Sequence, residues 1–560
     1  MSEKDSIGIV LSEATTQEAA CQILEKAERG GIREGMLLLV NLNAGREQIL
    51  ARVGQIVPFN AFYTPGDAWS EARRKEMDIP DEVARRYEIA KLDLLTLVGG
   101  DVIRTPPAPG ERVYQIDVVK DSEIIFGKKK GEEGILWFGS LSGYKEAPVP
   151  LNVEYAPMHM AVFGTTGSGK SYDMGVLIEK MSRIPVGGEG KYSSYPILVV
   201  DAHGDYVAYA NYVADGNSFG EFTWVKRYVF PEARTQTPDF RSKKMNGIIE
   251  PIGIHLDALT FREIAETVML FHKGTLQDAD LQVRALEEGF DRMYNDGYLS
   301  IHDIIKDPST LAILRGKMSK LVQQKVVHEA SSSAATRALE DFANEVESKH
   351  HLLSHSASMS DSFVDEITDK HGLAIVDFSA EGAPGVDLRV KQLVVTYLAT
   401  LLLKKFTKFK ITGDTRFLIV AIEEAHNFAP NINYPISYSL AKRKLSDIST
   451  QGRKFGLSLC IISQSPRFVD QIVVSMCNTF FIHKISHEDI SFVRNVTGGL
   501  PPSLLARLTT LHRGELVVTG QMNPVPFPLL ANVDDVRLVP HKTGETRVVL
   551  GLTRGGGPRK

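Results

Sequence analysis

The chain has 560 residues, of which 43% are hydrophobic and 24% are charged, and its formal net charge is −5 at pH 7. This length predicts about two to four domains, and the composition predicts a folded, soluble protein. The net negative charge excludes a protein that coats nucleic acid over its whole surface, so DNA contacts would need basic residues concentrated on one surface. The polar first residues exclude an ordinary signal peptide, and the apolar runs are too short to cross a membrane.

The three cysteines, Cys21, Cys460 and Cys477, have no close partner in the sequence. This spacing argues against a thiolate metal site and favours a reducing compartment. We therefore expect a cytoplasmic protein with no membrane partner.

Residues 1–150 are rich in short β-branched runs that Gly, Pro and Asn turns separate. Three of these runs are MLLLVNL (36–42), EQILARVGQIV (47–57) and RVYQIDVVK (112–120). Short strands at this spacing are typical of a small barrel or sandwich. The sequence therefore predicts an N-terminal β-barrel domain over residues 1–150.

The pattern changes after residue 150, where near-continuous apolar runs begin. These runs lie at 159–163, 196–201, 372–379, 416–424, 457–463 and 478–486. Strands buried on both faces have this pattern and occur in parallel sheets flanked by helices. We expect an α/β core in two parts, 151–256 and 363–510, interrupted by a helical insertion at 257–362 where amphipathic repeats replace the strands. Residues 511–560 are expected to hold C-terminal strands and a basic tail.

A Gly-rich segment directly after the first of these strands matches the phosphate-loop pattern G-x-x-x-x-G-K-[ST]. Its residues are Gly164, Thr165, Thr166, Gly167, Ser168, Gly169, Lys170 and Ser171. In such a loop the backbone N–H groups wrap the phosphates, Lys170 reaches the β and γ oxygens, and the Ser171 hydroxyl holds Mg²⁺. A strand enters the segment and a helical pattern leaves it, so we predict an ATP and Mg²⁺ site in preference to a chance match.

The run FLIVAIEEAH (417–426) ends an apolar strand on two acids, Glu423 and Glu424. At the mouth of a parallel sheet, the first acid is suited to the Mg²⁺ shell and the second to polarising the attacking water. Glu423 stands where Asp is usual. We assign Glu423 to the metal shell and Glu424 to general-base catalysis; the alternative is an acid pair that only starts a helix.

Two more polar side chains follow predicted strands. Gln464 ends the run LSLCIIS, where an amide would orient water near the γ-phosphate. Asp201 opens DAHGDY (201–206) at the mouth of another strand, where open α/β sheets bind ligands. We assign Gln464 to catalysis and Asp201 to nucleotide binding, with a tight turn as the alternative for Asp201.

Five motifs follow one another along the chain: HMAVFGTTGSGKS, VVDAHGDY, IVAIEEAHNFAP, QGRKFGLSLCIISQSP and LHRGELVVTG. In this order they resemble the HerA family of the FtsK–HerA superfamily, and the resemblance covers essentially the whole chain. It implies a RecA-like ATPase core, a homo-hexameric ring that threads double-stranded DNA, and a barrel that forms a docking face. In archaea that face typically carries the NurA nuclease. The resemblance therefore implies an ATP-driven DNA translocase that works with a NurA-like nuclease in DNA-end processing and repair.

The resemblance also assigns Arg453, in QGRKFG, to the active site of the neighbouring subunit. Taken alone, Arg453 would be an ordinary surface arginine at a helix end. Two positions depart from the family pattern: Met158 stands where Arg is common, and Ser465 follows Gln464 where Arg is common. A second arginine supplied in cis is therefore not supported.

Two other functions remain open at this stage. One is an ATP-gated ring scaffold for an effector enzyme in anti-phage defence, and the other is a conjugation- or packaging-type DNA motor. The acid pair with Gln464 and Arg453 favours a working ATPase over a pure scaffold. Basic clusters at 442–444 and 315–320 are candidate DNA contacts, with solvated helix faces as the alternative.

Overall fold

The computed structural model describes most of the chain. The described residues are 6–28, 31–60, 63, 70–77, 87–117, 125–188, 190–298, 300–354, 358–435, 439–533 and 535–539. The chain divides into two compact units, which we describe separately. The first unit comprises Met1–Tyr155, Gly164–Gly169 and Thr479–Asp535, and the second comprises Ala156–Phe163, Lys170–Asn478 and Val536–Lys560.

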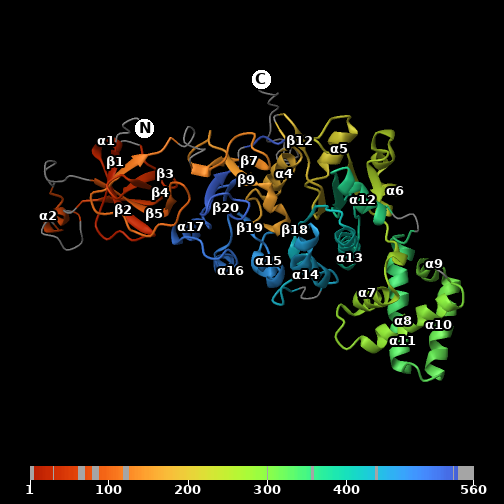
Figure 1. Ribbon diagram of the computed structural model, residues 1–560. Coiled ribbons are helices and arrows are strands. Elements are labelled where there is room, and N and C mark those ends of the chain that lie inside the picture. Colours follow the sequence, from red (N-terminus) through yellow and green to blue (C-terminus); the bar gives the residue numbers. More distant parts are fainter. Residues whose placement is uncertain are drawn as a thin grey trace. The chain divides into compact units, whose positions relative to one another are not determined.

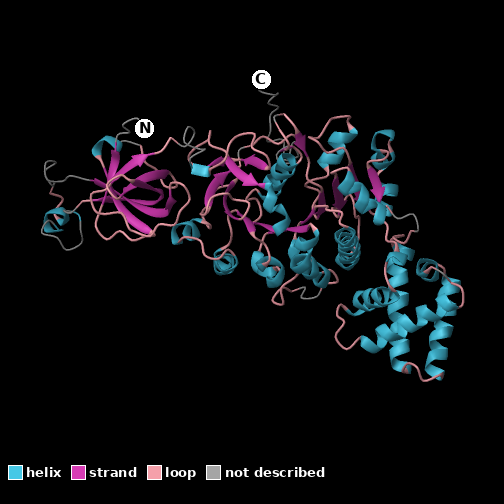
Figure 2. Cartoon of the chain, in the orientation of Figure 1, coloured by secondary structure: helices cyan, strands magenta, loops and turns pink. Residues whose placement is uncertain are grey.

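The first unit contains a closed antiparallel barrel, which confirms the predicted N-terminal barrel (Figure 2). Its strands are β1 (Ser6–Val10), β2 (Glu18–Ile23), β3 (Leu37–Leu42), β4 (Glu47–Phe59), β5 (Tyr87–Leu97) and β6 (Arg112–Gln115), and they close in the order β1-β2-β5-β4-β3-β6. Leu38, Val40, Ile49 and Val113 are fully buried inside it. Short helices α1 (Glu25–Glu28) and α2 (Ser70–Arg74) lie between the strands in sequence. Closing the barrel leaves no strand edge exposed to another chain.

The barrel is shorter than the predicted domain, because β6 closes it at Gln115. The next strands, β7 (Ile135–Phe138) and β9 (Val149–Asn152), form a separate two-stranded sheet, and β8 (Ser140–Leu141) pairs with β21. The unit also holds β19 (Thr479–Ile482), β20 (Glu515–Gly520), β21 (Leu529–Asn532), α16 (Ile490–Val496) and α17 (Pro502–Arg507). Residues 479–510, predicted in the α/β core, therefore group with the barrel unit. The predicted basic tail and the strand expected near 546–552 lie outside the described residues.

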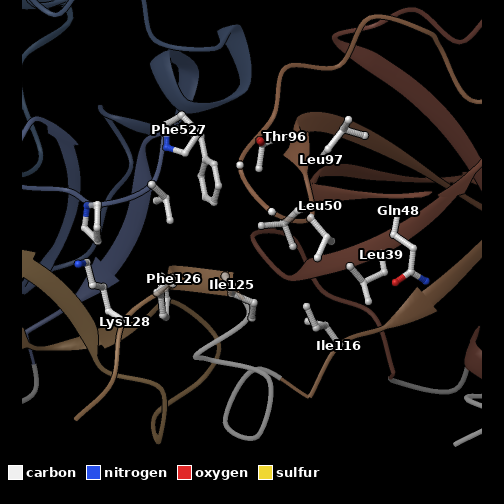
Figure 3. Close-up of a pocket in the computed structure, with 17 residues that line it drawn as sticks. Leu39, Gln48, Leu50, Thr96, Leu97, Ile116, Ile125, Phe126, Lys128 and Phe527 are labelled. Atoms are coloured by element: carbon white, nitrogen blue, oxygen red, sulfur yellow. The ribbon is translucent and has the colours of Figure 1, made fainter. Parts of the chain in front are cut away.

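A largely apolar cavity of about 600 Å³ lies within the first unit (Figure 3). Barrel side chains such as Leu50 and Leu97 line one part of it, and Phe126 and Phe527 line another. The loop Pro524–Phe527 joins β20 to β21, so the cavity combines barrel strands with the segment that follows β20.

The second unit is built on a parallel sheet, as the apolar runs predict. Its strands are β10 (Met160–Phe163), β13 (Ile197–Asp201), β14 (Val225–Val229), β15 (Ile249–Pro251), β16 (Leu373–Asp377), β17 (Leu418–Ile422) and β18 (Leu457–Ser463), in the order β15-β14-β16-β13-β17-β18-β10. Helices α4 (Lys170–Met181), α5 (Ala208–Ala214), α6 (Pro231–Gln236), α12 (Asp361–Asp369), α13 (Leu388–Thr412), α14 (Lys442–Gln451) and α15 (Gln471–Ser475) accompany it. This is the predicted RecA-like α/β core. A short hairpin of β11 (Ile184–Pro185) and β12 (Tyr192–Ser193) follows α4.

Strand β14 has no counterpart among the predicted strands, because charged residues interrupt its sequence, VKRYV. Arg227, at its centre, is almost fully buried. Its Nε donates to Oδ2 of Asp377, at the end of β16, over 3.0 Å. A buried guanidinium needs such a carboxylate partner. The partner lies 150 residues away in sequence, which is why the local pattern does not reveal the strand.

A group of helices interrupts the core at the predicted place (Figure 1). They are α7 (Phe261–Lys273), α8 (Asp280–Asn295), α9 (Ile301–Lys306), α10 (Pro308–Gln323) and α11 (Glu329–Ala343). Thr260 and Glu263 form a capping box that starts α7. Within the described ranges, no helix is both long enough and apolar enough to cross a bilayer.

Candidate functional site

The backbone of the Gly-rich loop between β10 and α4 adopts a conformation that favours glycine. Gly167 and Gly169 have φ of +78° and +116°, which side chains disfavour. A Cβ at Gly164 would lie 2.6 Å from the Cβ of His483. The amide of Thr165 donates to the Lys484 carbonyl at 2.7 Å. These constraints explain why glycine stands at these three positions of the loop.

Other loop residues have defined surroundings. The Ser168 carbonyl accepts from the amide of Gly514 at 3.0 Å. Thr166 and Gly167 are exposed at the tip of the loop, whereas Ser168 is buried. The tip of the loop is therefore accessible to a ligand, while hydrogen bonds to neighbouring segments hold its base in place.

Lys170 and Ser171 are the first two residues of α4. The Lys170 side chain is buried, with the residue 8% exposed. Burial lowers its pKa, and the neighbouring charges of Glu424, Glu423 and Asp205 oppose this effect. The Ser171 hydroxyl donates to Oε1 of Glu423 at 3.2 Å. The structure therefore brings the lysine and serine of the loop to the predicted acid pair.

Glu423 directly follows β17 and is buried. Its Oε2 accepts from the amide of Ala202 at 3.1 Å, so the side chain bridges α4 and the end of β13. Burial, together with the charges of Asp201 and Asp205, raises the pKa of Glu423 well above its usual range. A hydroxyl and a carboxylate 3.2 Å apart suit a Mg²⁺ ion, which takes few protein ligands.

Glu424 occupies the left-handed region, with φ +48° and ψ +48°. Its Oε1 accepts from Nε2 of Gln464 and lies 3.4 Å from Nε2 of His203. Its Oε2 lies 3.4 Å from Nδ1 of His426. Burial acts to raise the pKa of Glu424, but the bonds from His203 and Gln464 outweigh it and lower the pKa. An ionised carboxylate in this position is suited to accept a proton.

Two histidines of this site, His203 and His426, have no role in the sequence-based assignment. Both lie inside motifs that the sequence does single out, DAHGDY and EEAHNFAP. Their position after a strand end is the signal that places them near Glu424. The His203 side chain is 58% exposed, so it lies on the solvent side of the site.

Asp201 is fully buried and holds the turn that follows β13. Its Oδ1 accepts from the amides of Gly204 and Asp205 at 2.7 and 3.0 Å, and its Oδ2 accepts from the amide of Tyr206 at 2.9 Å. Because both oxygens are engaged by the backbone, these bonds match the tight-turn alternative. Direct contact of Asp201 with nucleotide stays a prediction.

Arg453 lies in a single 3₁₀ turn after α14 and is exposed. This exposure is compatible with both the role in a neighbouring subunit and the ordinary surface arginine. The candidate DNA contacts are partly neutralised within the chain. Lys442 pairs with Asp470 at 2.9 Å, Arg315 pairs with Glu340 at 2.9 Å, and Lys317 pairs with Asp296. These pairs favour the solvated-face alternative for both clusters.

A Gly-rich loop that leads into a buried lysine, together with an acid pair and a glutamine at neighbouring strand ends, defines a P-loop ATPase with a RecA-like core. The comparison with known families is more specific. Residues 136–402 match the model of the helicase HerA central domain. The chain is similar to the HerA helicases, and the resemblance seen in the sequence motifs is confirmed.

Curated relatives extend this likeness over most of the chain. The DNA double-strand break repair helicase HerA of Sulfurisphaera tokodaii is 24% identical over 94% of this chain and 92% of its own length. The protein of the same name from Saccharolobus solfataricus is 25% identical over 72% of this chain and 69% of its own length. Among solved structures, the bacterial conjugative coupling protein TrwB covers 72% of this chain and 91% of its own, at 15% identity and a TM-score of 0.48. This last likeness is too distant to bear on function.

The buried turn gives a prediction for Asp201. Burial and the charge of Asp377 raise its pKa to about 6 in the folded protein. Because the folded pKa exceeds the unfolded one, the stability that this group contributes is complete below about pH 4 and is lost as the pH rises through about 6. Asp201→Asn should remove a change on the order of 2 kcal/mol between these pH values. Urea unfolding at several pH values measures it.

The matched control is Glu329→Gln, which changes an exposed acid at the start of α11 and should keep the wild-type pH dependence. An Asp201→Asn protein whose stability follows the wild-type pH curve would contradict the raised pKa of Asp201.

Proposed function

We propose that the protein is an ATP-driven double-stranded DNA translocase that acts as a homo-hexameric ring in the cytoplasm. It would work with a NurA-like nuclease bound at the N-terminal barrel face, in DNA-end processing and repair. The observation that carries the proposal is the meeting of Lys170, Ser171, Glu423, Glu424 and Gln464 at one end of the sheet. The relatives named as double-strand break repair helicases support the DNA-directed part.

In this proposal the first residues of α4 bind the nucleotide. Lys170 extends to the β and γ phosphates of ATP, and the loop amides of residues 164–169 surround them. Ser171 and Glu423 would hold Mg²⁺, which neutralises phosphate charge when bound. Burial and the charges of Asp201 and Asp205 raise the pKa of Glu423, which disfavours its ionised form. A cation at this place favours the ionised form.

Glu424 acts on the attacking water in the proposed mechanism. Its lowered pKa keeps the carboxylate ionised, so it accepts the proton of the attacking water. As the water oxygen bonds to the γ-phosphorus, the bond from the γ-phosphorus to the β–γ bridging oxygen breaks and ADP leaves. Gln464 donates to Oε1 of Glu424. In this mechanism its amide orients the attacking water relative to the Glu424 carboxylate. His203 and His426 hold the carboxylate from either side.

The first test separates a DNA motor from a ring scaffold. ATP hydrolysis should rise several-fold when double-stranded DNA is added and should lose this stimulation at high salt, because phosphate contacts weaken as salt increases. Lys170→Ala is the matched control and should show no turnover with or without DNA. Displacement of a third strand from a DNA triplex then measures movement. Hydrolysis that is indifferent to DNA would favour the scaffold.

The acid pair gives a second prediction. Glu424→Gln should bind ATP with near-normal affinity and hydrolyse it at least 100-fold more slowly, on the order of what loss of a general base costs. Glu423→Gln should instead change the Mg²⁺ concentration needed for half-maximal turnover. Steady-state ATPase assays over a Mg²⁺ series measure both. The assignments are reversed if Glu423→Gln abolishes turnover at all Mg²⁺ concentrations while Glu424→Gln stays active.

Arg453 gives a third prediction, which tests the ring. If Arg453 completes the site of the neighbouring subunit, homomeric rings of Arg453→Ala or of Lys170→Ala contain no intact site. A mixed ring contains some interfaces at which an intact Lys170 meets an intact Arg453. Mixing the two inactive proteins should therefore restore part of the basal ATPase activity, measured without DNA once subunit exchange is verified.

The control adds wild-type subunits to each variant. Verified mixed rings that remain inactive, while activity rises only in proportion to added wild-type subunits, would show that Arg453 does not act in trans.

A further inference from the structure

The segment Val536–Val539, which we call the strap, lies against α4 in the second unit. The backbone amide of Leu538 donates to Oε2 of Glu179 at 2.7 Å, and that of Val539 donates to Oε1 at 3.4 Å. Glu179 belongs to the C-terminal half of α4. The strap is therefore attached to the same helix that begins with Lys170 and Ser171.

Arg537 inserts its side chain into this contact and is 2% exposed. Its Nη2 donates to the Tyr209 hydroxyl at 2.7 Å, and its Nε lies 3.7 Å from Oε1 of Glu179. The guanidinium carbon lies 5.2 Å from the ring centroid of Tyr209 and 5.7 Å from that of Tyr172. Tyr172 directly follows Ser171, so the arginine reaches the first turn of α4.

Gly175 makes room for this side chain. A Cβ at Gly175 would lie 2.4 Å from the guanidinium carbon of Arg537. Glycine inside a helix costs about 1 kcal/mol relative to alanine, so α4 is intrinsically weakened one turn after Lys170. The bound guanidinium occupies the space that the missing side chain leaves, and the Tyr209 hydroxyl lies 3.0 Å from the Gly175 carbonyl oxygen.

The attachment combines the Arg537 side chain, two backbone hydrogen bonds to Glu179 and one buried apolar side chain, Val539, which is 5% exposed. Val536 and Leu538 are 92% and 47% exposed, on either side of the buried arginine. Nε and Nη1 of Arg537 are buried and make no hydrogen bond to the described part of the chain. A buried charge with unfilled hydrogen bonds contributes little net stability, so the role of Arg537 is better explained by where it holds α4 than by the stability it adds.

We propose that Arg537 is a positioning residue for nucleotide binding and that the strap braces α4. When attached, the strap fixes the first two turns of α4 and with them Lys170 and Ser171. When detached, Gly175 leaves that part of the helix loose, and ATP binds more weakly. This inference rests on the proposed function of Lys170 and Ser171 as nucleotide ligands.

The test uses the full chain with Arg537→Ala, Arg537→Lys and Gly175→Ala. Arg537→Ala should raise KM for ATP about tenfold, equivalent to about 1.4 kcal/mol, with a smaller change in kcat. Arg537→Lys should be intermediate, because lysine keeps the charge and loses the planar fork. Gly175→Ala should displace the strap and raise KM to a similar extent. In the Arg537→Ala background it should add no further loss, since the clash is gone and alanine favours the helix.

Shortened chains provide a second, independent measurement. A chain of residues 1–539 should match the full chain, whereas a chain of residues 1–535 should show the weakened ATP binding. A synthetic peptide of residues 535–543 should restore binding to the 1–535 chain, and the same peptide with Arg537→Ala should not. Hydrogen exchange at the α4 amides should slow when the active peptide binds.

The outcomes separate the two levels of the proposal. A full chain that neither binds nor hydrolyses ATP would overturn the proposed function. An active full chain whose Arg537→Ala and 1–535 forms keep the wild-type KM would overturn the brace, and so would a lowered melting temperature with no change in KM. Loss of ATP binding in the 1–539 chain would assign the effect to the residues that follow the strap.

Discussion

The candidate site depends on the parallel register of β10, β18 and β17. Ile461 of β18 pairs with Ala161 on one side and with Ile422 on the other, so β10 and β18 end at the same level and β17 ends two residues before them. The acid pair, Gln464 and the start of the Gly-rich loop all follow directly from these ends. A register shift of one residue would send alternate side chains to the opposite face and separate Gln464 from Glu424. The buried apolar strands, which cannot shift without exposing their side chains, therefore position the polar groups.

This register places more acidic than basic side chains in the buried region at the strand ends. Glu423, Glu424 and Asp201 are buried at neighbouring strand ends, and Lys170 is the cation beside them. The two acids of the pair have opposite pKa shifts because their neighbours differ. Glu424 accepts from Gln464 and faces two histidines, whereas Glu423 faces Asp201 and Asp205. Such divergence between adjacent carboxyls is typical of sites in which one group binds a cation and the other transfers a proton.

Much of this arrangement could be predicted from the sequence, because it follows from local patterns. The apolar runs mark β10, β13, β16, β17 and β18, and the motifs at their ends mark Lys170, Ser171, Glu423, Glu424 and Gln464. Strand β14 could not be predicted in this way, since Arg227 is buried only through a partner that is distant in sequence. The end of the barrel at Gln115 depends on strand closure, which local periodicity does not reveal. The role proposed for Arg453 requires a second chain, so it follows from the family resemblance and not from local sequence patterns.

Helix α4 contains both the proposed nucleotide ligands and a glycine that weakens the helix. Its first two residues are the proposed nucleotide ligands, and Gly175 weakens the helix directly behind them. A helix selected only for stability would carry alanine there, because no backbone conformation requires glycine at that position. The glycine is explained by the guanidinium of Arg537, which needs the space. The rigidity of the phosphate-binding turn is therefore supplied in part from the far end of the chain. In the proposed arrangement, loss of the Arg537 contact would change ATP affinity without altering any residue that touches the nucleotide.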